Sequence, residues 1–295
     1  MWVRTLFAPT VCNDCIPDRG SRPGVVANVA DQFSPCQNFQ MSDTITVAFS
    51  NQKGGVGKST LTVLVASYLY YELGVKVAIM DCDSPQHSLK GERDRELKDL
   101  DRLPHIQALA DQQLAKSGLQ PYVVFDCLLE NTVQTMRKYI NGDNDVQILF
   151  LDFPGTMNNY NVLQAVSNCD YVFCPMAASK YDIESTLGYC QFIHDHIMMA
   201  GYGNLKKMQI LWNRIDARER KDIYSEYDAF MESIGLEAMR TTIPASVRFK
   251  RGLSANPKSK VFRSTLFPPD PSLVKGSGID ELAKEILALT GIGHG

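Results

Sequence analysis

The sequence Ala48-Phe49-Ser50-Asn51-Gln52-Lys53-Gly54-Gly55-Val56-Gly57-Lys58-Ser59-Thr60 joins an apolar run to a stretch with the composition of a helix. A glycine-rich turn between a strand and a helix is the setting of a phosphate-binding loop. The glycines let backbone N–H groups point at phosphate oxygens, and the helix adds the positive end of its dipole. Lys58 supplies a charge for the β- and γ-phosphates, and the Ser59 hydroxyl is a ligand for Mg²⁺. We therefore expect a nucleotide to be bound by Gly54, Gly55, Val56, Gly57, Lys58, Ser59 and Thr60.

Short apolar runs alternate with longer amphipathic stretches from Thr44 onward. Several runs lack an alternation of period two, which is typical of parallel strands buried on both faces. The predicted strands are Ile45–Ser50, Val75–Asp81, Tyr122–Cys127, Val146–Asp152, Tyr171–Pro175 and Met208–Asn213. The clearest predicted helices are Ser59–Leu73, Asp182–Ala200 and Asp222–Ile234, each followed by a glycine that can end it. This order predicts an α/β fold with a doubly wound, mostly parallel sheet and helices on both faces.

The loop departs from the ordinary G-x-x-x-x-G-K-[ST] pattern at its start. Gln52 stands where the first glycine belongs, and a second lysine, Lys53, follows it. The run Lys-Gly-Gly-Val-Gly-Lys-Ser-Thr over residues 53–60 resembles the deviant Walker A motif of the ParA/MinD family of ATPases. The resemblance implies binding of ATP with Mg²⁺ and slow, partner-stimulated hydrolysis. It also implies that ATP closes a homodimer, in which Lys53 reaches the partner's ATP and neutralises charge on the transferred phosphoryl group.

Two acidic motifs strengthen the resemblance. The segment Asp81-Cys82-Asp83-Ser84-Pro85-Gln86 is similar to the family's Asp-x-Asp-Pro-Gln motif, with Ser84 as one extra residue. By that match Asp83 orients or activates the attacking water. The run Gln147–Asp152 is apolar and ends in a carboxylate, as a Walker B motif does, so we expect Asp152 to hold Mg²⁺ through water.

Three further positions are expected around the nucleotide. Gly155 is placed to bring a backbone N–H to the γ-phosphate. The resemblance implies that Asn213 reads adenine, because its amide can pair with the exocyclic amine and a ring nitrogen. It also implies that Pro244 packs against the base.

Composition excludes some classes of protein. With 295 residues, 44% of them hydrophobic, and a formal net charge of −3, the chain is not a disordered polyelectrolyte. No apolar run reaches the roughly 18 residues that a membrane-spanning helix needs. The charged stretch Lys90–Arg102 carries both signs and predicts a solvated helix face.

The charge is unevenly distributed along the sequence. Residues Ala238–Pro269, which we call the basic segment, contain seven basic residues and no acidic one. In the ParA branch of the family such a surface binds DNA through its phosphates, without sequence preference. The resemblance therefore implies DNA contacts for basic residues of this segment, of which the strongest candidates are Arg248, Lys250, Arg251, Lys258, Lys260 and Arg263.

Family membership leaves the cargo open. Plasmid, chromosome, mobile-element DNA and a conjugation complex all fit a ParA-like ATPase with a ParB-like or transfer-complex activator. Such a protein is cytoplasmic and associated with the nucleoid when ATP is bound. One alternative is a MinD-like membrane-positioning ATPase, but the amphipathic helix expected at Ile279–Leu289 has a net acidic polar face, so we expect no stable membrane anchor. Another alternative is an ATPase that positions a protein cargo.

The first 40 residues differ from the rest. They contain four prolines, no helical or alternating apolar period, and Cys12, Cys15 and Cys36. We expect residues 1–40 to be a disordered leader or an extension before a start at Met41, and residues 41–295 to form one ATPase domain. The other five cysteines predict buried, reduced thiols.

Overall fold

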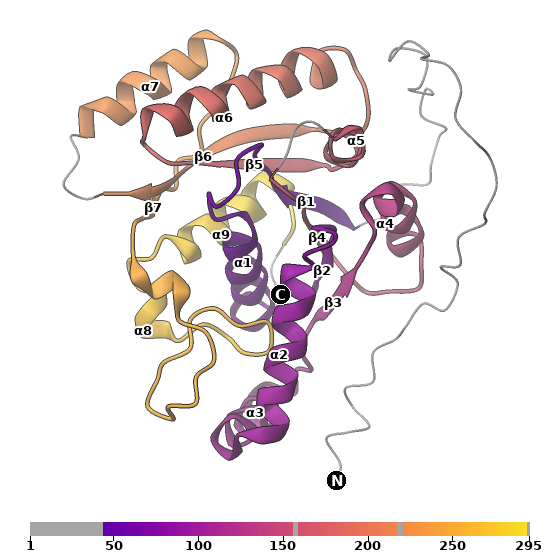
Figure 1. Cartoon of the computed structure of the whole chain (residues 1–295), viewed down its shortest axis with the longest axis vertical. Coiled ribbons are helices and arrows are strands. Elements are labelled where there is room, and N and C mark those ends of the chain that lie inside the picture. Colours follow the sequence, from indigo (N-terminus) through magenta and orange to yellow (C-terminus); the bar gives the residue numbers. More distant parts are fainter. Residues whose placement is uncertain (1–43, 156–158, 217–220, 294–295) are drawn as a thin grey trace. The chain divides into compact units, whose positions relative to one another are not determined.

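The computed structural model describes residues 44–155, 159–216 and 221–293 (Figure 1). The expected leader, residues 1–40, with Cys12, Cys15 and Cys36, lies outside the described residues, as does Met41. The five cysteines at positions 82, 127, 169, 174 and 190 are buried thiols outside any disulfide, as predicted.

A seven-stranded parallel sheet forms the centre of the fold, in the order β3-β2-β4-β1-β5-β6-β7. Its strands are β1 (Ile45–Phe49), β2 (Val77–Asp81), β3 (Val123–Asp126), β4 (Ile148–Asp152), β5 (Tyr171–Met176), β6 (Lys207–Ile215) and β7 (Ile243–Pro244). The six predicted strands are therefore confirmed, and β7 is an additional short edge strand. The predicted doubly wound fold is also confirmed.

Helices connect the strands and cover both faces of the sheet (Figure 1). The α-helices are α1 (Lys58–Leu73), α2 (Ser88–Arg102), α3 (Pro104–Ser117), α4 (Thr132–Ile140), α5 (Tyr160–Ser167), α6 (Lys180–Ile193), α7 (Lys221–Ser233), α8 (Pro271–Val274) and α9 (Ile279–Thr290). Single turns of other helix types are η3 (Leu129–Asn131), η4 (His194–Met198) and η5 (Val247–Lys250). The π-turn η4 continues α6, so the predicted helix Asp182–Ala200 is one α-helix with a π-turn at its end.

Two apolar layers hold the sheet between its helices. Strand β1 shows why its sequence is a continuous apolar run: Val47 and Phe49 pack against α1 and α9, whereas Ala48 faces the layer under α5 and α6. All three residues are fully buried. A parallel strand covered on both sides favours apolar residues on both of its faces, which removes the alternation of period two.

The C-terminal helix α9 packs against α1 with its apolar residues in the core. This is the packing expected from the amphipathic pattern of Ile279–Leu289. Among the described residues, no helix combines the length and apolar character that crossing a membrane requires.

The expectation that Lys90–Arg102 forms only a solvated helix face is wrong. Helix α2 buries Arg93 and Glu96, which are 8% and 5% exposed. Both side chains are hydrogen-bonded to Thr265 of the basic segment, so burial of their charge is compensated. The mixed charges of this helix predicted exposure, because the pattern gives no sign that some of these charged residues have partners far away in the sequence.

Candidate functional site

Strand register brings the motifs together at the carboxyl edge of the sheet. Asp152, the last residue of β4, is paired with Phe49 of β1 on one side and with Asp81 of β2 on the other. The phosphate-binding loop follows β1, and Asp83 follows β2. From the central strand β1 the chain continues through α1 to β2 on one side of β1, whereas β5 lies on the other side of β1. Ligands of open α/β sheets bind at the carboxyl ends of the strands where the connections diverge in this way. Residues more than 100 positions apart thus surround one site.

Glycines leave room for close packing around the loop. Gly57 has a φ of 100°, and a Cβ there would lie 2.8 Å from the Asn213 Nδ2 atom. At Gly155, which follows β4, a Cβ would lie 2.8 Å from the backbone nitrogen of Gly54 and 2.9 Å from the Lys58 Nζ atom. Any side chain at Gly155 would therefore fill the space next to the loop amides and the lysine. The backbone N–H groups of the loop and the Lys58 ammonium are the kinds of group that bind a phosphate.

Asp152 and Lys58 are buried charged residues of opposite sign at the site. Asp152 is fully buried, and neither of its carboxylate oxygens has a hydrogen-bond partner among the described residues. Burial raises the pKa of Asp152 to about 7, against the opposing effects of the Ser59 hydroxyl and the Lys58 ammonium group. Burial also lowers the pKa of Lys58, while Asp152 and Asp83 act to raise it. An unpaired buried carboxylate beside a hydroxyl is a donor set that fits Mg²⁺.

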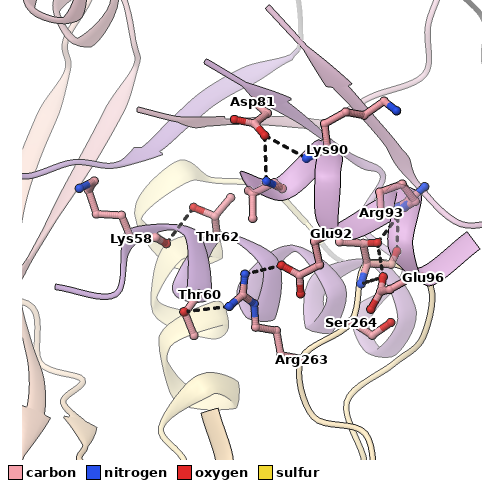
Figure 2. Close-up of polar contacts among 12 residues, drawn as sticks. Lys58, Thr60, Thr62, Asp81, Lys90, Glu92, Arg93, Glu96, Arg263 and Ser264 are labelled. Atoms are coloured by element: carbon pink, nitrogen blue, oxygen red, sulfur yellow. Dashed lines mark hydrogen bonds and ion pairs between the residues drawn. The ribbon is translucent and has the colours of Figure 1, made fainter. Parts of the chain in front are cut away.

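Asp81 and Asp83 have different surroundings. Asp81 is fully buried, and its Oδ2 atom accepts the N–H groups of Leu89 and Lys90 at 2.8 and 2.9 Å, which fixes the start of α2 (Figure 2). Asp83 is half-buried, and burial together with the neighbouring Asp81 raises its pKa. The extra residue Ser84 is accommodated in a turn that the His87 N–H closes on the Asp83 carbonyl at 2.7 Å. Asp81 therefore has a structural role, and Asp83 remains available to the site.

The start of the loop is attached to α6. The Asn51 Nδ2 atom donates to the Thr186 hydroxyl at 2.8 Å, and the Gln52 Nε2 atom donates to the Ser185 carbonyl at 2.7 Å. Lys53 forms an ion pair with Asp182 in the first turn of the same helix. Burial would raise the pKa of Asp182, but the hydrogen bonds from Lys53 and Ser179 lower it.

Sequence reasoning missed the contacts of α6 with the loop. The only available signal was polarity: Asp182, Ser185 and Thr186 lie at i, i+3 and i+4, and therefore on one side of the helix. That spacing identifies a common face but not the partner of the face.

The two residues expected at the adenine base lie on the neighbouring strands β6 and β7. Asn213 of β6 donates from Nδ2 to the Val56 carbonyl at 2.7 Å and accepts the Arg214 N–H at Oδ1, 2.9 Å away. Its amide therefore supports the loop in this structure. Pro244 lies in β7 and is paired with Ile215, two residues beyond Asn213.

The six candidate basic side chains differ in exposure. Lys250, Arg251 and Lys258 are exposed, and Lys260 is exposed while it is paired with Asp270 and donates to the Ser272 hydroxyl. Arg248 is half-buried and donates to the carbonyls of Leu273 and Lys275 at 3.0 and 2.9 Å. Arg263 is also half-buried, and it is paired with Glu92 of α2. The exposed four are the candidates that remain accessible to a phosphate backbone.

Comparisons with known proteins agree with this geometry. The chain is 24% identical over 249 residues to the chromosome-partitioning ATPase Soj of Thermus thermophilus, across 82% of this chain and 95% of Soj. Its fold is similar to a plasmid partition protein of Borrelia burgdorferi bound to AMPPNP, with a TM-score of 0.55, 15% identity, and 83% and 99% of the two chains covered.

A second structural relative is the septum site-determining protein MinD of Pyrococcus horikoshii, complexed with Mg-ADP. The TM-score is 0.53, with 18% identity and coverage of 84% and 98% of the two chains. These two structures show the fold. The model of the CobQ/CobB/MinD/ParA nucleotide binding domain matches residues 47–257, which include the loop, both acidic motifs and most of the basic segment. The chain therefore belongs to the CobQ/CobB/MinD/ParA family of nucleotide-binding domains, as its deviant Walker A loop predicted.

Proposed function

We propose that this protein is a ParA-type ATPase that dimerises when it binds ATP and Mg²⁺ and then binds DNA without sequence preference. The observation that carries the ATPase proposal is the meeting of Lys58, Asp152 and Asp83 beside a loop with room for phosphate. An ammonium group and two carboxylates with perturbed pKa values at one point are typical of a catalytic site. The Mg-ADP and AMPPNP complexes of the structural relatives support the choice of ligand.

Different residues of the site have different roles in hydrolysis. The amides of residues 54–60 and the Lys58 ammonium bind and orient the phosphates. Ser59 and Asp152 would hold Mg²⁺, which neutralises phosphate charge when bound. Asp83 holds the attacking water, and its raised pKa brings it closer to the range in which a carboxylate accepts a proton at neutral pH. Lys53 would leave Asp182 and reach the partner's phosphates in the dimer, where its charge stabilises the transition state.

DNA binding is proposed from the exposed part of the basic segment. Lys250 ends η5, and Arg251, Lys258 and Lys260 follow it before α8. The basic segment itself, Ala238–Pro269, has no acidic side chain, and Asp270, which comes directly after it, is paired with Lys260. Lysines and arginines on a solvent-exposed loop bind phosphates and release counterions, so the binding should weaken steeply with salt. The named roles of Soj and the Borrelia protein in chromosome and plasmid partition support DNA as the partner. We further propose that the cargo is a plasmid, mobile-element DNA or a conjugation complex, whose ParB-like or transfer-complex component stimulates hydrolysis.

Co-sedimentation with DNA and with anionic liposomes tests the proposal, using ATP, ADP and no nucleotide. The expected result is ATP-dependent sedimentation with DNA that is lost as salt is raised. A triple variant Lys250→Ala/Arg251→Ala/Lys258→Ala should bind DNA at least about tenfold more weakly. A control matched in charge, Lys98→Ala/Lys116→Ala/Lys284→Ala, removes exposed lysines of α2, α3 and α9 and should bind as the wild type does. Liposome binding would instead support the membrane-positioning alternative, and binding to neither would support a protein cargo.

A further inference from the structure

Side chains, rather than backbone ladders, hold the later part of the basic segment in place. No helix or strand is present among the described residues between Lys250, at the end of η5, and Pro271, at the start of α8. Within this stretch Phe262, Ser264 and Thr265 are nonetheless fully buried. The Ser264 carbonyl accepts a hydrogen bond from the Ser67 hydroxyl of α1 at 2.7 Å. The stretch is therefore docked on the helices beside the nucleotide site.

Helix α2 provides the charged part of this docking surface. Arg93 donates to the Thr265 hydroxyl and the Thr265 carbonyl, each at 2.8 Å, and Glu96 accepts the Thr265 N–H at 2.8 Å (Figure 2). A third hydrogen bond of the Arg93 guanidinium, from Nη2 and also at 2.8 Å, goes to the Tyr122 carbonyl. These bonds are directional and fix where Thr265 lies along the helix.

Arg263 makes the contact that reaches the nucleotide site. Its guanidinium is paired with Glu92 of α2 and donates to the Thr60 hydroxyl of α1, with an Nη1–Oγ1 distance of 3.4 Å (Figure 2). Thr60 follows Ser59, and the start of α2 is fixed by Asp81. Arg263 therefore touches both helices that begin at the site, one after the phosphate loop and one after the acidic motif.

We propose that Arg263, held between Glu92 and Thr60, couples nucleotide binding to the position of the basic segment, so that Mg²⁺-ATP stabilises the docked segment. The proposal rests on the proposed function, because it assigns regulation to the same nucleotide site and the same DNA-binding surface.

The physical reason is the position of Thr60 in the first turn of α1. A nucleotide held by the loop amides and the Ser59 hydroxyl restrains that turn, and with it the acceptor of the long Arg263–Thr60 bond. The Arg263 Nε atom is buried and has no hydrogen-bond partner within the described part of the chain, so the guanidinium contacts are not saturated. A small movement of α1 or α2 therefore changes how well Arg263 is bound. Coupling of this kind is reciprocal: occupation of the basic segment by DNA should tighten ATP binding by the same factor.

Hydrogen exchange in the full chain tests the coupling without DNA. The variant is Glu92→Gln, which removes the ion pair but no basic residue. In the wild type, a non-hydrolysable ATP analogue with Mg²⁺ should slow amide exchange in residues 252–262 at least about fivefold. In Glu92→Gln the analogue should still bind, as a separate titration checks, but should change this exchange less than about twofold. Size-exclusion chromatography establishes that both proteins are in the same oligomeric state. The control Asp101→Asn alters an exposed carboxylate at the end of the same helix and should behave as the wild type does.

A second variant separates coupling from folding. Glu92→Leu/Arg263→Met replaces the pair with apolar side chains, which restores packing where a single change leaves a charge without its partner. It should fold, as a thermal melt verifies, and should also lose the nucleotide effect on exchange. Wild-type coupling in this double variant, or in Glu92→Gln, would overturn the proposal.

DNA affinity provides an independent readout. The ratio of DNA affinities with analogue and with ADP should fall severalfold in Glu92→Gln, although every basic residue remains. If Glu92→Gln instead raised DNA affinity equally in both nucleotide states, Arg263 would be only a released phosphate contact, and the coupling role would be wrong. If the wild type showed coupled exchange but no DNA binding, the DNA function would fail while the coupling stood.

Discussion

Replacing Asp152 with asparagine removes a charge that the protein buries without a hydrogen-bond partner in the described residues. We expect this variant to be more stable than the wild type at pH 8 when no nucleotide is present, and to lose Mg²⁺-dependent hydrolysis. The two effects have one cause. A carboxylate prepared to hold Mg²⁺ in a buried position is destabilising until the metal arrives.

The size of the effect follows from the raised pKa. Burial moves the pKa of Asp152 from 3.8 to about 7, and each unit corresponds to roughly 1.4 kcal/mol. Between about pH 4 and pH 7 the native state keeps a proton that the unfolded chain has lost, so the free energy of unfolding falls as pH rises through this window. The total fall attributable to Asp152 is roughly 4 kcal/mol. The asparagine leaves its own amide without partners, which costs about 1–3 kcal/mol, so the net gain at pH 8 is about 1–3 kcal/mol.

Urea denaturation of both proteins at pH 4.5, 6, 7 and 8 measures this difference. At pH 4.5 the variant should be no more stable than the wild type, and the difference should shift in favour of the variant as pH rises to 7. At pH 8, Mg²⁺-ATP at about 100 times its Kd should stabilise the wild type by about 2.7 kcal/mol and should leave the variant without a Mg²⁺-dependent gain. Parallel pH profiles for the two proteins would refute the assignment of an uncompensated buried charge to Asp152.

Three other substitutions address the remaining parts of the site. Asp83→Ala should bind nucleotide normally but lower ATP turnover at least about 100-fold in a phosphate-release assay, and wild-type turnover would remove Asp83 from the mechanism. Lys53→Ala should retain nucleotide affinity in calorimetric titration while its turnover falls about 100-fold or more, since its charge is needed only in the dimer; an equal loss of affinity would place Lys53 in its own subunit's site. Gly57→Ala forces a side chain into a backbone with φ of 100° and to within 2.8 Å of the Asn213 amide, so the nucleotide-free protein should lose at least about 1–2 kcal/mol of stability. Gly54→Ala is its control, because a Cβ at Gly54 meets no atom within 4 Å, and equal thermal destabilisation of the two variants would contradict this reasoning.

Most of the sheet could be predicted because burial on both faces leaves a strong signal. Strand β4 consists of four apolar residues followed by Asp152, and all five are buried. The sequence shows this burial as a continuous apolar run that ends in a carboxylate. Helix α1 ends where Gly74 adopts a left-handed conformation with φ of 69°, which a glycine after a helical stretch predicts. The motifs then predicted that the site lies at the carboxyl edge of the sheet, because each motif follows the carboxyl end of a strand.

Contacts between distant segments could not be predicted in the same way. Lys53 has a conspicuous place in the sequence, but its ion pair with Asp182 spans 129 residues and depends on how α6 packs beside the loop. Asn213 stays a predicted adenine contact, and no local pattern indicated that its amide also donates to the Val56 carbonyl. In both cases the residue type was informative, whereas the partner was decided by tertiary packing that no local pattern records.

Helix α2 illustrates the same limit and carries a further argument. Replacing buried charged side chains with apolar residues often leaves a protein equally stable, so stability alone does not explain why α2 buries Arg93 and Glu96. Apolar side chains would hold the chain around Thr265 through hydrophobic contact, which is not directional and would allow the chain to shift along the helix. The hydrogen bonds of Arg93 and Glu96 to the Thr265 backbone and hydroxyl are directional and allow one register only. Arg263 lies two residues before Thr265 in the chain, so this register places Arg263 against Glu92 and Thr60. The buried charges of α2 therefore specify the position of the basic segment relative to the nucleotide site, which is the property that coupling between the two requires.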